Sequence, residues 1–148
     1  MTEKIKNITE EFFQKASFDV EVNVSKEENT FRIKLKSDEP QTLIGVNGQT
    51  LAEIQKLLRS VIKHSVLEEI FIDLDVNSYK QKKAEYLKGI ALEAANEVFL
   101  SQKEKVLFPM SSYERRIVHM QLLNRSDVKT ESIGEDPNRR IVIKPTLS

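Results

Sequence analysis

The spacing of apolar residues changes along the first half of the chain, and this change limits the folds that the sequence can adopt. From Phe18 to Val24, and again from Phe31 to Leu35, every second residue is apolar. A period of two predicts two strands with one buried face, joined as a hairpin by the intervening Lys-Glu-Glu-Asn turn. From Leu51 to Ile62 the apolar residues recur every three or four positions, which predicts a helix from about Gly48 to His64.

The remaining segments predict further helices and strands in both halves of the chain. A helix over residues 5–15 precedes the hairpin, and a strand over residues 70–74 follows the second helix. The second half predicts a long helix capped by Asn77 or Ser78, a short strand ending at Pro109, a helix over residues 112–124 and two strands over residues 128–133 and 139–144. We therefore predict an α+β protein of two small, two-layer α/β domains, residues 1–76 and residues 77–148.

Composition narrows the classes of function. The chain has no cysteine, so disulfides and thiolate metal sites are excluded, and a reducing cytoplasm is the expected location. No apolar run approaches the ~20 residues that a membrane-spanning helix needs, and the charged N-terminus lacks the apolar core of a signal peptide. We expect no membrane insertion, no metal and no cofactor.

The net charge of zero conceals an asymmetry between the halves. Residues 1–76 contain 10 Lys and Arg against 14 Asp and Glu, whereas residues 77–148 contain 13 against 9. The positive excess of the second half is compatible with a polyanion site. A solvated surface of mixed charge explains it equally well.

Gly45 and Gly48 are two of only four glycines, and they stand in an otherwise helix-forming run, Leu-Ile-Gly-Val-Asn-Gly-Gln-Thr-Leu. Inside a helix each would cost about 1 kcal/mol relative to alanine. Around Val46 and Asn47, the two glycines instead allow a tight turn that a ligand backbone can approach, just before a helix N-terminus that favours phosphate. A plain helix–helix turn is the alternative interpretation.

A second candidate site lies in the sequence Ser-Tyr-Glu-Arg-Arg-Ile-Val-His. Arg115 and His119 are four residues apart and therefore share one face of the predicted helix. The guanidinium of Arg115 is a planar donor suited to phosphate, and His119 adds further donors. Arg116 lies about a quarter turn away. A solvated helix surface is the alternative for all three.

The order helix, strand, strand, helix, Gly-x-x-Gly, helix, strand resembles a KH domain of the bacterial type. Together, Gly-Val-Asn-Gly, Pro-Met-Ser-Ser-Tyr-Glu-Arg-Arg-Ile-Val-His and Thr-Glu-Ser-Ile-Gly-Glu-Asp-Pro-Asn-Arg-Arg resemble the Jag family of SpoIIIJ-associated RNA-binding proteins. That family joins a KH domain to an R-3-H (Arg-x-x-x-His) domain. Its members usually carry a further N-terminal domain and linker, so the sequence resembles an excised part or a shortened relative.

The resemblance implies binding of single-stranded RNA, or single-stranded DNA, by a bacterial regulator of post-transcriptional events or of envelope growth and division. It implies that Gly45, Val46, Asn47 and Gly48 form the KH loop that clamps about four nucleotides. Arg115 and His119 match the R-3-H pair, with Arg139 and Arg140 on the strand after the Glu-Asp-Pro-Asn turn. The loop departs from the family pattern because neither Val46 nor Asn47 is basic. Some relatives act with a small, separate KH protein.

Two other classes of function compete with RNA binding. Asp73 and Asp75 alternate along one strand face, which is compatible with a two-carboxylate metal site but is more often a solvated surface. No nucleophile-elbow, Walker or zinc-protease motif is present, so we do not expect an enzyme. A protein-interaction module that uses the neutral loop or a sheet edge is the stronger alternative.

Overall fold

The computed structural model describes residues 1–146. The chain divides into two compact units, Met1–Lys80 and Gln81–Ser148. The division falls in the first turn of a helix, a few residues beyond the boundary expected from the sequence. The mixed α+β fold of each unit confirms the predicted fold class.

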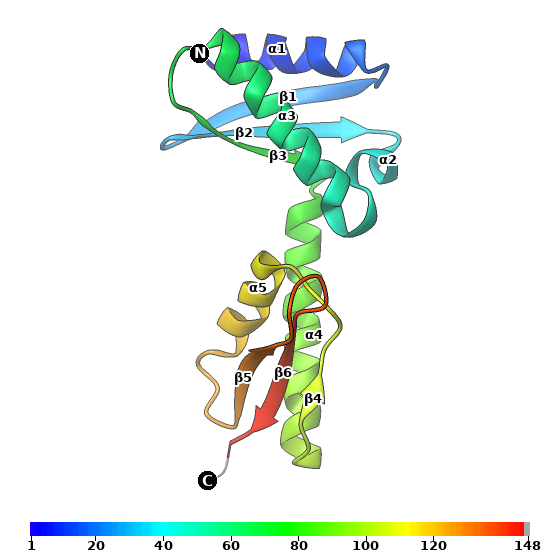
Figure 1. Cartoon of the computed structure of the whole chain (residues 1–148), viewed down its shortest axis with the longest axis vertical. Coiled ribbons are helices and arrows are strands. Elements are labelled where there is room, and N and C mark those ends of the chain that lie inside the picture. The colour runs from blue at the N-terminus through cyan, green and yellow to red at the C-terminus, as the bar shows by residue number, and fades with distance from the viewer. Residues whose placement is uncertain (147–148) are drawn as a thin grey trace. The chain divides into compact units, whose positions relative to one another are not determined.

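The first unit follows the order expected of a KH domain (Figure 1). Its elements are α1 (Thr2–Lys15), β1 (Val20–Glu27), β2 (Thr30–Ser37), α2 (Pro40–Ile44), the 3-10 turn η1 (Val46–Gly48), α3 (Gln49–Ser65) and β3 (Phe71–Val76). The sheet order is β1-β2-β3, with β1 antiparallel and β3 parallel to β2. The parallel pairing follows from the crossover through α2 and α3, since a parallel neighbour cannot be reached by a tight turn.

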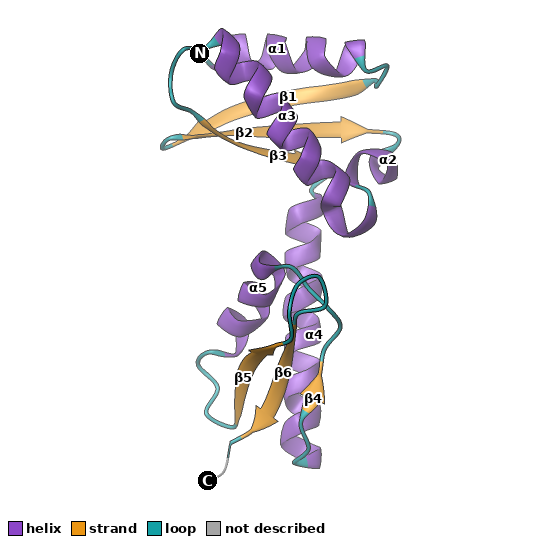
Figure 2. Ribbon diagram, viewed as in Figure 1, coloured by secondary structure: helices purple, strands orange, loops and turns teal. Residues whose placement is uncertain are grey.

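The core of the first unit occupies one face of this sheet. Phe31, Ile33 and Leu35 of β2 are almost fully buried together with Ile5 and Phe13 of α1. Leu51, Leu58 and Ile62 of α3 join the same cluster. The period-two strands and the period-3.6 helices therefore bury their apolar faces against each other in two layers, with helices on one side of the sheet (Figure 2).

The opposite face of the sheet carries the polar residues of the hairpin. Glu21 lies opposite Lys36 and Asn23 lies opposite Lys34, so acidic or amide residues of β1 face basic residues of β2. Arg32 does not share this arrangement, because its partners are Glu27, at 2.7 Å, and Asp73 of β3, at 3.0 Å.

The second unit is a smaller two-layer α+β fold. It contains α4 (Tyr79–Ser101), whose first turn belongs to the first unit, β4 (Lys105–Val106), α5 (Ser112–Leu122), β5 (Val128–Ile133) and β6 (Arg140–Pro145). The three strands form an antiparallel sheet of order β4-β6-β5. The core cluster joins Leu87, Ala91 and Val98 of α4 and Val118 of α5 to Ile143 of β6. Both helices therefore bury their apolar rows with the same sheet.

The capping of α4 differs from the expectation. Asn77 and Ser78 have φ of 50° and 58°, so neither has the extended backbone of a typical N-cap residue. The carboxylate of Asp75 instead accepts from the backbone N–H of Lys80, at 3.2 Å and 3.3 Å. The amide side chain of Asn77 bonds to both the N–H and the C=O of Ser37 and so ties this turn to the end of β2.

Candidate nucleic-acid interface

The Gly-x-x-Gly segment adopts a conformation that requires glycine at its first position. Gly45 has φ 71° and ψ −172°, a region that residues with a side chain scarcely populate. A Cβ at this position would overlap Thr50 and would lie 2.7 Å from the Thr50 Cβ. The chain therefore passes directly against the first turn of α3, and only glycine allows this approach.

The second half of the loop turns in the left-handed region. Asn47 (φ 54°, ψ 27°) and Gly48 (φ 77°, ψ 11°) both occupy it, and asparagine is among the side chains that tolerate it best. A Cβ on Gly48 would lie 3.1 Å from the ring of Tyr79, so this aromatic residue packs against the loop. The loop is thus held on both sides, by Thr50 and by Tyr79.

The loop presents its central residues to solvent in front of a helix N-terminus. Val46 is 77% exposed, whereas Ile44 and Leu51 beside it belong to the core. No side chain caps the N-terminus of α3 within the described residues. Backbone N–H groups at such a terminus carry a partial positive charge and favour a phosphate group. Ile44 and Leu51 support the loop from inside.

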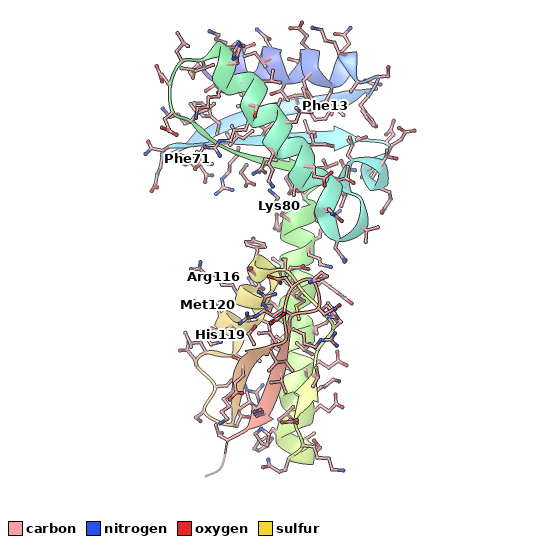
Figure 3. The ribbon with its side chains drawn as sticks, viewed as in Figure 1. Phe13, Phe71, Lys80, Arg116, His119 and Met120 are labelled. Atoms are coloured by element: carbon pink, nitrogen blue, oxygen red, sulfur yellow. The ribbon has the colours of Figure 1, made fainter. Side chains whose placement is uncertain are left out.

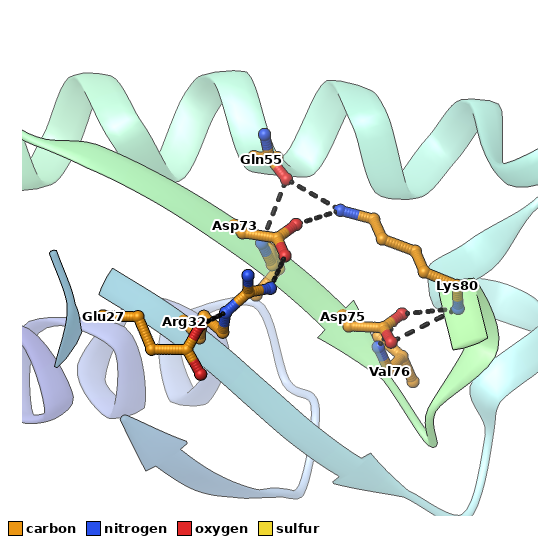
Figure 4. A network of polar contacts seen from close by, with 8 residues as sticks. Glu27, Arg32, Gln55, Asp73, Asp75, Val76 and Lys80 are labelled. Carbon is orange, nitrogen blue, oxygen red and sulfur yellow. Dashed lines mark hydrogen bonds and ion pairs between the residues drawn. The ribbon is translucent and has the colours of Figure 1, made fainter. Parts of the chain in front are cut away.

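A polar network closes the edge of β3 next to α3 (Figure 4). Gln55 of α3 accepts from the backbone N–H of Leu74 at 3.0 Å and from the ammonium of Lys80 at 3.2 Å. Lys80 also pairs with Asp73 at 2.5 Å, and Asp73 pairs with Arg32. The Asp73 and Asp75 side chains, both partly exposed, are therefore engaged in holding β3 and the first turn of α4.

In the second unit, α5 begins with a capping box. The Ser111 hydroxyl accepts from the Glu114 backbone N–H at 3.2 Å, and the Glu114 carboxylate accepts from the Ser111 backbone N–H at 3.0 Å. Val118 and Leu122 point into the core, as the helical spacing indicates. The cap and the core row together fix the rotation of α5, and so fix which of its side chains face solvent.

Arg115 is committed to internal contacts. Its Nη1 donates to the Met110 carbonyl at 2.5 Å and lies 3.5 Å from the Asp136 carboxylate, and its Nη2 donates to Ser112 at 3.3 Å. Only 11% of the side chain is exposed. The guanidinium thus joins the start of α5 to the turn between β5 and β6, and its donors are engaged within the fold.

His119 and Arg139 are exposed side chains on the same side of this unit. His119 Nδ1 lies 2.6 Å from the Thr130 hydroxyl, and Arg139 Nε donates to the Ser132 hydroxyl at 2.7 Å. Thr130 and Ser132 are two residues apart on β5 and so point to the same face. The structure therefore brings His119 and Arg139 to neighbouring positions through two hydroxyl residues that the sequence did not single out.

Arg116 and Arg140 have surroundings that differ from those of His119 and Arg139. Arg116 is exposed and faces a groove lined also by Lys88 and Tyr113, and Figure 3 labels it beside Met120 on α5. Arg140 pairs in register with Ile133 and donates to the Asn138 carbonyl at 3.1 Å. Arg139 precedes β6, which begins at Arg140, and the two guanidinium groups have different partners, Ser132 for Arg139 and the Asn138 carbonyl for Arg140.

A bidentate ion pair fixes the start of β5. Arg125 Nε and Nη2 donate to the two carboxylate oxygens of Asp127 at 2.9 Å and 2.5 Å, and Nη1 donates to Asn96 of α4 at 2.9 Å. The hydrogen bond from Arg125 holds the pKa of Asp127 below its ordinary value of 3.8. This pair joins the strand that carries Thr130 and Ser132 to the long helix.

Within residues 1–146, no three His, Asp or Glu side chains gather closely enough to hold a metal ion. The same part of the chain contains no helix with the length and apolar character that crossing a bilayer requires.

Comparison with known proteins agrees with the division seen in the structure. Residues 3–85 match the KH domain model, and residues 85–145 match the R-3-H domain model. The chain is a member of the Jag family.

Relatives named "RNA-binding protein KhpB" match most of this chain. The protein of Clostridium symbiosum is 36% identical over 125 residues, which cover 84% of this chain and 56% of the relative. The protein of Lactiplantibacillus plantarum is 37% identical over 101 residues, covering 68% of this chain and 31% of the relative. The Bacillus subtilis protein is 31% identical over 125 residues, which cover 83% of this chain and 60% of the relative. The chain thus spans less than two thirds of the length of these relatives.

Proposed function

We propose that this chain binds single-stranded RNA through the Gly45–Gly48 loop and through the exposed His119 and Arg139 side chains of its R-3-H domain. The observation that carries the proposal is the loop: glycine-dependent, solvent-facing at Val46, and placed at the uncapped N-terminus of α3. Such a loop accepts a sugar–phosphate backbone through N–H groups and needs no basic side chain for a basal affinity. His119 and Arg139 supply the second contact.

The family relationship supports a wider role for this activity. The relatives are named RNA-binding proteins and come from bacteria. We propose that the chain acts in the bacterial cytoplasm as a post-transcriptional regulator, with consequences for envelope growth or division, and that a small separate KH protein is a partner. Catalysis is not part of the proposal, because Asp73 of the first unit is taken up by structural ion pairs.

Replacing both Val46 and Asn47 with aspartate tests the loop. Both changes keep the fold, because Val46 is exposed and aspartate tolerates the left-handed backbone of Asn47. We expect the double variant to lose most of its affinity for a fluorescent single-stranded RNA in an anisotropy titration, since two anions face the phosphates. Unchanged affinity in a folded double variant would remove the loop from the site.

Val46→Lys is the matched gain-of-function variant. It adds a cation at the exposed loop position without placing lysine at the positive φ of Asn47. We expect tighter RNA binding and a salt dependence steeper by up to ~0.7 in log–log slope, the increment for one additional phosphate contact on a single strand.

Protein binding is the second candidate function. Leu57, Leu67 and Phe71 of the first unit are 58%, 96% and 51% exposed, and the loop itself is neutral. The ionic-strength titration separates the two functions: binding of an RNA backbone weakens steeply with salt, whereas an apolar protein contact does not.

A further inference from the structure

A groove between α4 and α5 in the second unit is lined by aromatic, apolar and basic side chains. It has a volume of ≈ 280 Å³ and is lined by Lys88 of α4 and by five residues of α5: Tyr113, Arg116, Ile117, Met120 and Gln121. The five α5 residues follow helical spacing, so they form one continuous face. Arg115 and His119 fall outside this lining, and their contacts lie toward the β5–β6 turn and β5.

The apolar surface in this groove is exposed. Tyr113 is 62% exposed and Met120 is 55% exposed, while Ile117 is partly buried against the core and forms the base of the groove. The capping box at Ser111 and Glu114 fixes the helix turn on which Tyr113 stands. A tyrosine held in this way offers a planar surface at little conformational cost.

The charge around the groove is positive. Lys88 and Arg116 are its charged lining residues, and the lining contains no carboxylate. Lys88 lies 4.0 Å from Glu85, but both side chains are solvent-exposed, and such a pair contributes little. An aromatic ring and a thioether favour a ligand with a planar ring that can stack on them. The two cations favour a ligand that also carries an anionic group.

We propose that this groove binds an unpaired nucleobase of an RNA strand, stacked on Tyr113 and Met120, with the adjacent phosphate held by Arg116 and Lys88. The proposal rests on the RNA-binding function proposed above and adds a base-stacking site to it. Stacking between bases and aromatic rings tolerates many sequences, because every base has a π face. Gln121 adds donors and an acceptor at the edge of the base.

The test compares Tyr113 variants of the full chain on three probes: a single-stranded RNA of ~10 nucleotides, within the usual range of single-strand site sizes, its abasic counterpart and the same sequence as a duplex. We expect Tyr113→Ala to weaken binding of the single strand at least about fivefold and to leave binding of the abasic strand unchanged. Arg116→Ala should weaken binding of both strands, because it removes a phosphate contact. Tyr86→Ala is the matched control, since Tyr86 is 57% exposed on α4 and does not line the groove.

A spectroscopic measurement separates stacking from a loss of folding. The chain has three tyrosines and no tryptophan, so its ultraviolet emission comes from tyrosine. We expect Tyr113→Phe to bind RNA as the parent does but to lose part of the emission quenching that RNA causes, because phenylalanine stacks without emitting in the tyrosine band. Met120→Glu should weaken RNA binding by placing an anion in the groove.

The outcomes are distinct. Wild-type affinity of the Tyr113→Ala protein for single-stranded RNA, or equal quenching in the Tyr113→Phe protein, would overturn the groove site and leave RNA binding by the chain intact. A parent protein that binds none of the three probes would overturn the proposed function itself.

Discussion

Arg115 and Arg116 are neighbours in the sequence with opposite surroundings. The rotation of α5 turns Arg115 toward the Met110 carbonyl and Asp136, while Arg116 extends into the α4–α5 groove. A helix places consecutive residues about 100° apart, so one of two adjacent arginines can serve the fold while the other serves a ligand. In this chain the contacts of Arg115, the first residue of the Arg-x-x-x-His pair, therefore lie within the fold.

Arg115→Ala should therefore lower the stability of the protein, whereas Arg116→Ala should lower its affinity for RNA. Loss of the charge-assisted bond to the Met110 carbonyl should destabilise the second unit by about 1.5–3 kcal/mol, because Arg115 is largely buried. Arg116→Ala should change stability by less than about 0.5 kcal/mol while weakening RNA binding. Urea denaturation and RNA anisotropy on both variants check this, and equal stability of the two variants would contradict the role given to Arg115.

The Arg125–Asp127 pair gives a pH-dependent contribution to stability. The pKa of Asp127 is lowered on folding, so the ionised carboxylate favours the folded state. This contribution is complete above the ordinary pKa of 3.8 and is lost as the pH falls through the lower folded value. We expect Asp127→Asn to destabilise the protein at neutral pH and to differ less from the parent at a pH well below 3.8. Denaturant midpoints at both pH values check the sign; a difference that is undiminished in acid would contradict it.

The elements themselves were predictable wherever one strong pattern acted alone. Period-two spacing identified β1 and β2, and two glycines marked the turn before α3. The cap of α4 was not predictable, because Asp75 reaches it from the preceding strand and local spacing favours Asn77 or Ser78. The partners of Arg115 were hidden for a related reason: Asp136 approaches only when β5 and β6 pair.

In the turn before α3, alanine should destabilise the protein more at position 45 than at position 48. Gly45→Ala combines a disfavoured backbone conformation with overlap of Thr50, and we expect a loss of about 2–4 kcal/mol in unfolding free energy. Gly48→Ala should cost about 1–2 kcal/mol, since only its left-handed backbone and a near contact with Tyr79 oppose it.

Removing the Thr50 side chain in a Gly45→Ala, Thr50→Gly variant should recover the part of the loss that comes from overlap. Thermal and urea unfolding of these variants measure both effects. The ranking would be wrong if Gly48→Ala proved the more damaging change.

At the scale of the whole molecule, the two proposed RNA-binding sites belong to two units of one chain. Once one unit holds an RNA strand, the other meets that strand at a high effective concentration. We expect the Val46→Asp, Asn47→Asp change and Arg139→Ala each to weaken binding of a long single strand far more than binding of a short one. Anisotropy over a series of RNA lengths measures this. Equal losses at every length would mean that the two units do not share a strand.

The network around Gln55 and Asp75 also has a consequence for how the folded protein behaves in a crowded solution. β3 lies at the end of its sheet, where unpaired N–H groups would ordinarily invite another strand to add. Gln55 accepts from the Leu74 N–H, and Asp75 accepts from the Val76 N–H at 2.9 Å, so two of these donors are already satisfied by the chain's own side chains. An incoming strand would have to displace these two contacts before it could pair with Leu74 or Val76. The same contacts that hold α3 and α4 in place thus protect this border against aggregation, and the amide protons of Leu74 and Val76 should exchange with deuterium as slowly as those of an interior strand.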